Sequence, residues 1–189
     1  PDADDLAVIA YTSGTTGRSK GAMLLHRNLV ANIEAICEAW RWTANGYLLL
    51  TLPLFHTHGL MVGAHGTFFS GASAELRRKF DAAAVYDALL EGSFTMFFGV
   101  PTMYTRLLRE AEAREERPSP LRLYVAGSAA LSPQAFEQFE ERFGERILER
   151  YLSRPEEIWE FRRLHSGVLS PSPSRMSTNP YYVGFQILK

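Results

Sequence analysis

The residue types best suited to chemistry are concentrated in one short segment near the start of the chain. Residues 12–21 read TSGTTGRSKG. Glycines let the backbone approach a ligand closely, so successive N–H groups can converge on one anion, and Lys20 adds a full positive charge. Hydroxyl donors surround the same point, namely those of Thr12, Ser13, Thr15 and Thr16. This composition predicts a phosphate-binding loop; a solvated turn without a ligand is the alternative.

The elements on either side of this loop distinguish it from a P-loop. A P-loop needs four residues between its first glycine and Gly-Lys, followed by Ser or Thr, and it leads into a helix. Residues 14–21, GTTGRSKG, do not have that spacing. The apolar residues 6–11 before the loop and 21–25 after it are both typical of strands. We therefore expect a hairpin that holds phosphate at its tip, with a helix beginning near His26 or Asn28.

The rest of the chain alternates between strand-like and helix-like segments. Further strands are expected at 47–52, 94–98 and 121–125. Helical spacing of apolar residues recurs at 29–40, at 85–90 and through 103–108. Ser132 followed by Pro133 predicts an N-cap and a helix over 134–142. Such alternation favours an α/β fold, a layered and largely parallel sheet with flanking helices.

Composition and charge exclude several classes of protein. With 189 residues, 46% of them hydrophobic, the chain is long enough for one domain with a real core. Its net charge of -1 provides no global field for nucleic acid or anionic lipid. No apolar run approaches a membrane span, and the acidic start is unlike a signal peptide. The single cysteine, Cys37, is expected to be a buried structural thiol. We expect a cytoplasmic protein that binds no nucleic acid.

The charged run and the C-terminal residues have simpler interpretations. Residues 110–117, EAEAREER, predict a solvated helix end before Pro118. Residues 152–189 do not continue the α/β pattern, because residues 166–174, SGVLSPSPS, have loop composition. We treat 1–151 as one unit and 152–189 as a divergent tail, either a poorly packed end or a folded extension.

Four stretches in order carry a resemblance to a known family. Residues 11–21, YTSGTTGRSKG, resemble the phosphate-binding signature of the adenylate-forming superfamily, which includes acyl-CoA synthetases, peptide-synthetase adenylation domains and firefly luciferase. Three later stretches resemble further motifs of that superfamily: 52–60 (LPLFHTHGL), 98–104 (FGVPTMY) and 123–131 (LYVAGSAAL). The combination is most similar to malonyl-CoA or methylmalonyl-CoA synthetases. The resemblance covers residues 6–151.

The resemblance implies a fold, a reaction and a set of ligands. Residues 1–151 would form the central part of the large N-terminal domain of an adenylate-forming enzyme. A carboxylate would attack ATP to give acyl-AMP and pyrophosphate, and coenzyme A would then displace AMP. The ligands implied are ATP, Mg²⁺, coenzyme A and a small carboxylate, here a short dicarboxylate such as malonate. Both steps concentrate negative charge, which explains a donor-rich loop.

The resemblance also implies roles for individual residues. The β- and γ-phosphates of ATP would be held by Thr12, Ser13, Gly14, Thr15, Thr16, Gly17 and Lys20. The pocket for adenine and the acyl group would be shaped by Gly127, Ser128 and Ala129, with Tyr151 near the adenine and Val100 near the acyl chain. His56 would be the catalytic residue at the carboxylate end of the acyl site, where an imidazole can hydrogen-bond the reacting group.

Several departures and alternatives accompany these expectations. Ser19 stands where the loop usually has proline, and residues 152–156, LSRPE, replace the expected Gly-Met-Thr-Glu, so the Mg²⁺-binding glutamate has no matched position. The ribose-binding aspartate and the adenylation lysine would lie beyond residue 189. We therefore expect a central fragment that is inactive by itself. The alternatives are a non-catalytic nucleotide- or acyl-binding core, a peptide-synthetase adenylation domain, or a ligase for longer fatty acids.

Two other kinds of site receive less support from the sequence. His56, His58 and His65 have no cysteine or carboxylate at ligand spacing, which favours core or gate histidines over a metal cluster. Neither Ser13 nor Ser128 lies in a Gly-x-Ser-x-Gly elbow with an assignable His and Asp. A hydrolase is therefore disfavoured.

Overall fold

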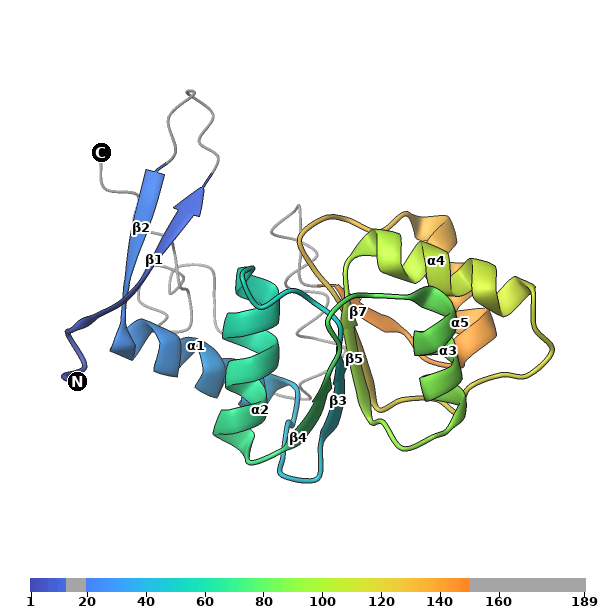
Figure 1. Cartoon of the computed structure of the whole chain (residues 1–189), viewed down its shortest axis with the longest axis horizontal. Coiled ribbons are helices and arrows are strands. Elements are labelled where there is room, and N and C mark those ends of the chain that lie inside the picture. Colours follow the sequence, from blue (N-terminus) through green and yellow to red (C-terminus); the bar gives the residue numbers. More distant parts are fainter. Residues whose placement is uncertain (13–19, 150–189) are drawn as a thin grey trace, which may run out of the picture. The chain divides into compact units, whose positions relative to one another are not determined.

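The computed structural model describes residues 1–12 and 20–149 of the chain (Figure 1). These residues form two compact units, one comprising residues up to Arg41 and the other beginning at Trp42. None of the helices in these described ranges combines the length and the apolar character that a membrane span requires.

The first unit is an antiparallel hairpin with one helix. Strands β1 (Leu6–Thr12) and β2 (Lys20–Leu25) pair in a register that places Thr12 opposite Lys20. Helix α1 (His26–Ala39) follows β2 directly, and the Leu25 N–H donates to Asn28 Oδ1 at its start. The predicted hairpin is therefore confirmed. Residues 13–19, the predicted tip of the hairpin, lie outside the described residues.

Cys37 lies on α1 and is buried. Its burial raises the pKa of its thiol, because a low-dielectric surrounding disfavours the thiolate. The predicted burial of Cys37 is therefore confirmed.

The second unit is a five-stranded parallel sheet with helices on both faces (Figure 1). The strand order is β4-β3-β5-β6-β7, with β3 (Tyr47–Leu50), β4 (Ser73–Leu76), β5 (Met96–Gly99), β6 (Leu123–Ala126) and β7 (Ile147–Glu149). Helices α3 (Ala82–Leu90), α4 (Pro101–Glu112) and α5 (Pro133–Phe143) pack on one face. The predicted α/β fold is confirmed.

A π-helix and a short α-helix on the other face were not predicted. The π-helix η1 (His58–Ala64) runs directly into α2 (His65–Ser70). Glycine lowers intrinsic helix propensity, but here the glycines allow close packing. A Cβ on Gly63 would lie 2.7 Å from the Leu50 side chain, and one on Gly66 would lie 2.3 Å from the Trp42 ring. The glycines therefore let η1 and α2 approach their neighbours.

The boundaries of several other elements differ from the predicted ones. The strands expected at 47–52, 94–98 and 121–125 are β3, β5 and β6: β3 begins as predicted and ends two residues earlier, and β5 and β6 are displaced by one or two residues. Strands β4 and β7 were missed, because β4 is mostly exposed and β7 has only three residues. Ser132 caps α5 as predicted, since its hydroxyl accepts from the Ala135 N–H at 3.3 Å.

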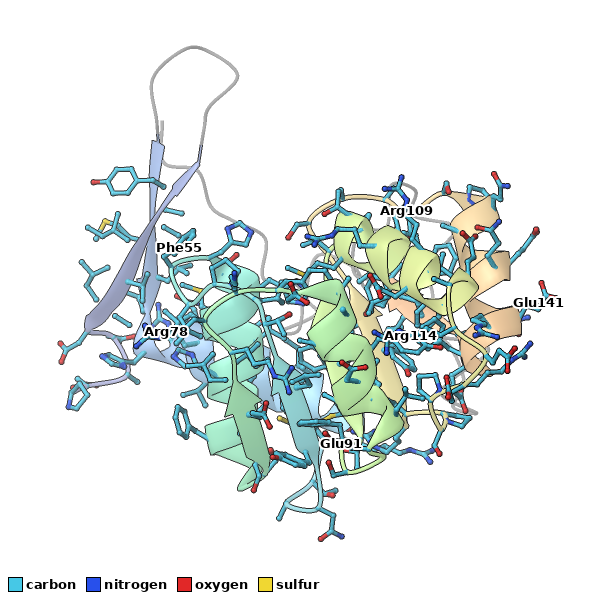
Figure 2. The ribbon with its side chains drawn as sticks, turned by 45° about the vertical axis from the view of Figure 1, so that its right-hand side comes forward. Phe55, Arg78, Glu91, Arg109, Arg114 and Glu141 are labelled. Carbon is cyan, nitrogen blue, oxygen red and sulfur yellow. The ribbon has the colours of Figure 1, made fainter. Side chains whose placement is uncertain are left out.

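The charged end of α4 is largely exposed, as predicted, but Arg114 makes specific contacts. Arg114 (labelled in Figure 2) forms an ion pair with Asp87 of α3, and its guanidinium lies 5.1 Å from the ring centre of Tyr86. A second carboxylate, that of Glu110, lies 3.5 Å away. Arg114 therefore links α4 to α3.

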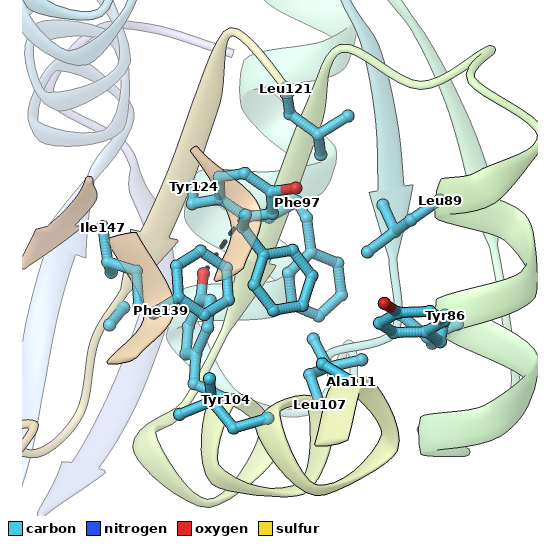
Figure 3. Close-up of a cluster of buried hydrophobic side chains, with 14 of the residues drawn as sticks. Tyr86, Leu89, Phe97, Tyr104, Leu107, Ala111, Leu121, Tyr124, Phe139 and Ile147 are labelled. Atoms are coloured by element: carbon cyan, nitrogen blue, oxygen red, sulfur yellow. Dashed lines mark hydrogen bonds between the residues drawn. The ribbon is translucent and has the colours of Figure 1, made fainter. Parts of the chain in front are cut away.

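The core between the sheet and α3–α5 is dominated by aromatic side chains (Figure 3). Phe139 stacks edge-on against both Tyr104 and Tyr124. The fully buried Tyr104 hydroxyl donates to the Val125 carbonyl at 2.8 Å and lies 3.4 Å from the Phe97 carbonyl. Tyr104 therefore fastens α4 to both β5 and β6.

Replacing Tyr104 with phenylalanine tests this fastening. The variant removes a buried hydroxyl that donates to the Val125 carbonyl, so we expect the free energy of unfolding to fall by about 0.5–1.5 kcal/mol. Chemical denaturation of the wild type and the variant measures the change. Thr105→Val on the same helix is the control, because its hydroxyl bonds the Pro101 carbonyl at an exposed position. Equal losses in the two variants would contradict the role of Tyr104.

Candidate functional site

The candidate site of the second unit lies at the carboxyl ends of β3, β5 and β6. In open parallel sheets, ligands bind in the crevice outside these ends. The segment after β3 carries His56, the one after β5 carries Val100, and the one after β6 carries residues 127–129. Three of the four stretches that carry the sequence resemblance thus end at the same edge of one sheet.

The segment that carries His56 folds back on itself. The His56 N–H donates to the Pro53 carbonyl at 3.1 Å, and the His56 carbonyl accepts from the Leu60 N–H at 3.0 Å. Gly59 closes this turn, because a Cβ there would lie 2.4 Å from the Pro53 carbonyl oxygen. The neighbouring Phe55 (labelled in Figure 2) is almost fully exposed. The turn thus holds an exposed imidazole on a fixed backbone.

The turn after β6 is held by three contacts. The Gly127 N–H donates to the Gly99 carbonyl at 3.2 Å, which continues the pairing of β5 with β6. The Leu131 N–H donates to a carboxylate oxygen of Glu149 at 2.7 Å. A Cβ on Gly127 would lie 2.8 Å from the His58 ring, so only glycine permits this close approach.

Ser128 has an unusual backbone conformation and lies beside His56. Its φ of 72° lies in the left-handed region, which costs a non-glycine residue free energy. Its hydroxyl oxygen lies 3.4 Å from Nε2 of His56. Both side chains are exposed, so both can contact a ligand. Serine at a strained position beside an imidazole is typical of a binding site rather than of a turn chosen for stability.

The remaining predicted site residues are placed as follows. Val100 is half-buried and precedes α4, where its carbonyl accepts from the Met103 N–H at 2.8 Å. Ala129 is exposed beside Ser128. Thr12 and Lys20 are paired at the end of the hairpin that leads into residues 13–19. The residues outside the described ranges are Ser13, Gly14, Thr15, Thr16, Gly17 and Tyr151.

The predicted histidines do not act as one group. His56 is exposed, whereas His58 is buried beneath Gly127 and lies parallel to the Phe98 ring at 6.2 Å. Within residues 1–12 and 20–149, no three His, Cys, Asp or Glu side chains converge to hold a metal ion. Such a cluster is not required for Mg²⁺, because proteins often hold this ion with only one or two carboxylates plus substrate phosphates.

Three positioning residues were missed by sequence reasoning. The turn after β6 has three supports. Tyr104 donates to the Val125 carbonyl of β6, and the His58 ring packs against Gly127. The Glu149 carboxylate accepts from the Leu131 N–H. His58 was interpreted as a core or gate histidine and is indeed buried, but its contact with Gly127 was not predicted. Glu149 lies two residues before the predicted site residue Tyr151, and this was its only link to the site in the sequence. Nothing in the sequence predicts its hydrogen bond with Leu131.

Comparison with known proteins identifies the family. Residues 1–151 match the family described as AMP-binding enzyme. The chain belongs to this family. All four stretches that carried the sequence resemblance lie within the matched residues.

Curated relatives within the AMP-binding family are CoA ligases. A malonate–CoA ligase of Arabidopsis thaliana is 36% identical over 166 residues, which cover 78% of this chain and 27% of that protein. A long-chain-fatty-acid–CoA ligase of Bacillus subtilis (strain 168) is 35% identical over 150 residues, covering 78% and 27%. The chain thus spans about a quarter of the length of these relatives.

Solved structures of AMP-binding enzymes share the fold. The ATP-bound MatB of Rhodopseudomonas palustris is 40% identical with a TM-score of 0.70, over 80% of this chain and 30% of that chain. A malonyl-CoA ligase with methylmalonyl-CoA and AMP bound is 39% identical with a TM-score of 0.73, over 80% and 33%. The predicted assignment to the N-terminal domain of an adenylate-forming enzyme is confirmed.

The strain at Ser128 can be measured by substitution. Ser128→Gly removes the cost of the positive φ, so we expect the free energy of unfolding to rise by about 1 kcal/mol. Ser128→Ala keeps the strain and should change stability by less than about 0.5 kcal/mol at this exposed position. Chemical denaturation of both variants provides the measurement. A Ser128→Gly variant no more stable than Ser128→Ala would show that the position is unstrained.

Proposed function

We propose that this chain is the central part of an ATP-dependent acyl-CoA ligase that activates a short dicarboxylate such as malonate. The observation that carries the proposal is the contact of Ser128 with His56 at the carboxyl edge of the sheet, in a chain whose relatives include a malonate–CoA ligase. The reaction would join a carboxylate to AMP with release of pyrophosphate, and coenzyme A would then displace AMP.

The pairing of Thr12 with Lys20 supports the phosphate-binding role of the hairpin. Because the two residues are opposite each other in the register, the seven residues between them begin and end at one point. The glycines, hydroxyls and lysine of 12–20 are the donors that a triphosphate requires. In this proposal, Ser13, Gly14, Thr15, Thr16 and Gly17 surround the β- and γ-phosphates, and Mg²⁺ reduces their charge.

The Ser128 and His56 pair supports binding of a carboxylate. A hydroxyl and an imidazole N–H can each donate to one carboxylate, and both groups are exposed at the sheet edge. His56 would orient the reacting oxygen, and Ser128 would donate to the acyl group. Val100 would contact the acyl chain, and Gly127, Ala129 and Tyr151 would surround the adenine.

Two alternatives differ in activity or in substrate. A non-catalytic nucleotide- or acyl-binding core would bind ATP without making acyl-AMP. A peptide-synthetase adenylation domain or a ligase for longer fatty acids would activate other carboxylates, and one relative is a long-chain-fatty-acid–CoA ligase. Pyrophosphate exchange into ATP separates these alternatives when malonate, methylmalonate, acetate and longer fatty acids are compared. In the full-length parent we expect exchange with malonate or methylmalonate above the others.

Lys20→Ala tests the phosphate-binding role in the 189-residue chain. Loss of a charge-assisted bond to phosphate should weaken ATP binding by about 1.5–3 kcal/mol, roughly 10- to 150-fold in Kd. Isothermal titration calorimetry measures the change. Lys79→Ala removes the same charge from the second unit and is the matched control. Unchanged affinity in Lys20→Ala would contradict the assigned role.

His56→Ala and Ser128→Ala test the carboxylate-binding role. Each removes one donor, so we expect the Kd for malonate to rise about 5- to 30-fold, which corresponds to about 1–2 kcal/mol per bond. Chemical-shift titration of the chain with malonate measures both constants. His65→Ala, a substitution of a half-buried histidine at the start of α2, should leave the Kd unchanged. If His65→Ala had the same effect as His56→Ala, the contact between His56 and the substrate would be rejected.

A further inference from the structure

One face of the β1–β2 hairpin is apolar and open. Ile9 lies directly opposite Met23, and Tyr11 lies opposite Gly21, so these four residues share a face. Ile9 is 47% exposed, Met23 55% and Tyr11 74%. A Cβ on Gly21 would lie 2.9 Å from the Ile9 side chain and 3.5 Å from the Tyr11 ring. The absence of that Cβ lets both side chains lie across β2. We call these four residues the open face.

The opposite face of the hairpin is better covered. Val8 and Ala10 of β1 and Leu24 of β2 point to that side and are half-buried, and α1 packs against both strands. A two-stranded hairpin is only marginally stable in water unless its apolar faces are covered. Among the described residues, the open face has no comparable cover, as its exposure shows.

The chain itself contains a suitable occupant outside the described residues. Residues 181–188 read YYVGFQIL, with six aromatic or aliphatic side chains in eight positions. Aromatic and β-branched residues suit packing on a pleated surface, and leaving so many in water is costly. Tyr181, Val183, Phe185 and Ile187 alternate with their neighbours, which is the spacing needed to place them on one side of an extended segment.

The connecting chain is long enough for this docking. Strand β7 ends at Glu149, and residues 150–180 separate it from the apolar segment. A stretch of that length can extend to roughly 100 Å. Residues 181–188 can therefore reach the open face whatever the arrangement of the two units.

The open face is a better match than the exposed apolar residues of α2 and β4. Phe68 and Phe69 of α2 are exposed but adjacent on a short helix, so their side chains diverge by about 100°. Leu76 is one residue of an edge strand. The open face instead offers three large side chains side by side on a continuous surface.

We propose that residues 181–188 dock on the open face and cover the second side of the hairpin. The docked segment would bury Ile9, Tyr11 and Met23 under its own aromatic and aliphatic side chains. Since β1 and β2 flank residues 13–19, this cover would also stabilise the strands that carry the proposed phosphate-binding loop. The docking itself does not rest on the proposed enzymatic function.

Cysteine cross-linking tests the docking directly. Met23→Cys with Phe185→Cys, in a Cys37→Ala background, should form an intramolecular disulfide at least tenfold faster than Met23→Cys with Ser166→Cys. A disulfide needs Cα atoms within about 7 Å, so only a docked segment meets the condition often. Non-reducing gels and mass spectrometry at low protein concentration follow the reaction. Equal rates for the two pairs would overturn the proposal, and so would a disulfide formed mainly between two copies, because a second copy would then occupy the open face.

Hydrogen exchange provides a test without cysteines. The double variant Phe185→Asp/Ile187→Asp should lower the protection of the β1 and β2 amides at least tenfold, while the amides of β5 and β6 keep theirs. Gln186→Asp adds a charge between the same two positions and is the control, expected to leave the hairpin amides unchanged. If the double variant left the protection of the hairpin amides unchanged, the tail would not be their cover and the proposal would fail.

Discussion

The parallel pairing of β5 with β6 is the interaction on which the candidate carboxylate site depends. It continues past the strands as the bond from the Gly127 N–H to the Gly99 carbonyl, so the turn after β6 begins in a fixed register with the segment after β5. Tyr104 reinforces the pairing from α4 by donating to the Val125 carbonyl. A shift of either strand against the other would change the position of Val100 relative to Ser128, because Val100 follows β5 directly and Ser128 lies just after β6.

The site is built from residues that stability alone would not select. Ser128 has a positive φ that glycine would adopt at a lower free-energy cost. The His58 ring packs so closely against Gly127 that any side chain at that position would collide with it. The core compensates for such strain elsewhere. The strands that lead to the site lie over fully buried aromatic side chains, namely Phe97, Tyr104, Tyr124 and Phe139. Rigid support beneath a strained turn keeps the Ser128 hydroxyl beside His56 without requiring a ligand to organise it.

Sequence patterns predicted the elements whose signals are local, and missed those that depend on distant neighbours. The hairpin followed from two apolar runs around a polar loop, and α5 followed from its capping serine and first proline. The stretch containing η1 and α2 was assigned no element, and its local helix signal is weak because Gly63 and Gly66 are poor helix formers. Both glycines are needed because a side chain from a distant part of the sequence approaches each of them closely. His56 and Ser128 were identified from motifs 72 residues apart, but their contact depends on strand order and on one positive φ. No local sequence pattern encodes the strand order or the positive φ. The hydrogen bond from the Leu131 N–H to Glu149 of β7 has no local sequence signal either.

Binding of the acyl carboxylate of a short dicarboxylate by His56 and Ser128 is the centre of the proposed function. A crystal structure of the protein with a non-hydrolysable malonyl-adenylate analogue tests it most directly. We expect the malonyl group within hydrogen-bond distance of the Ser128 hydroxyl and the His56 imidazole, at the carboxyl ends of β3 and β6. A malonyl group bound elsewhere, with neither side chain in contact with it, would contradict the proposed role of both residues.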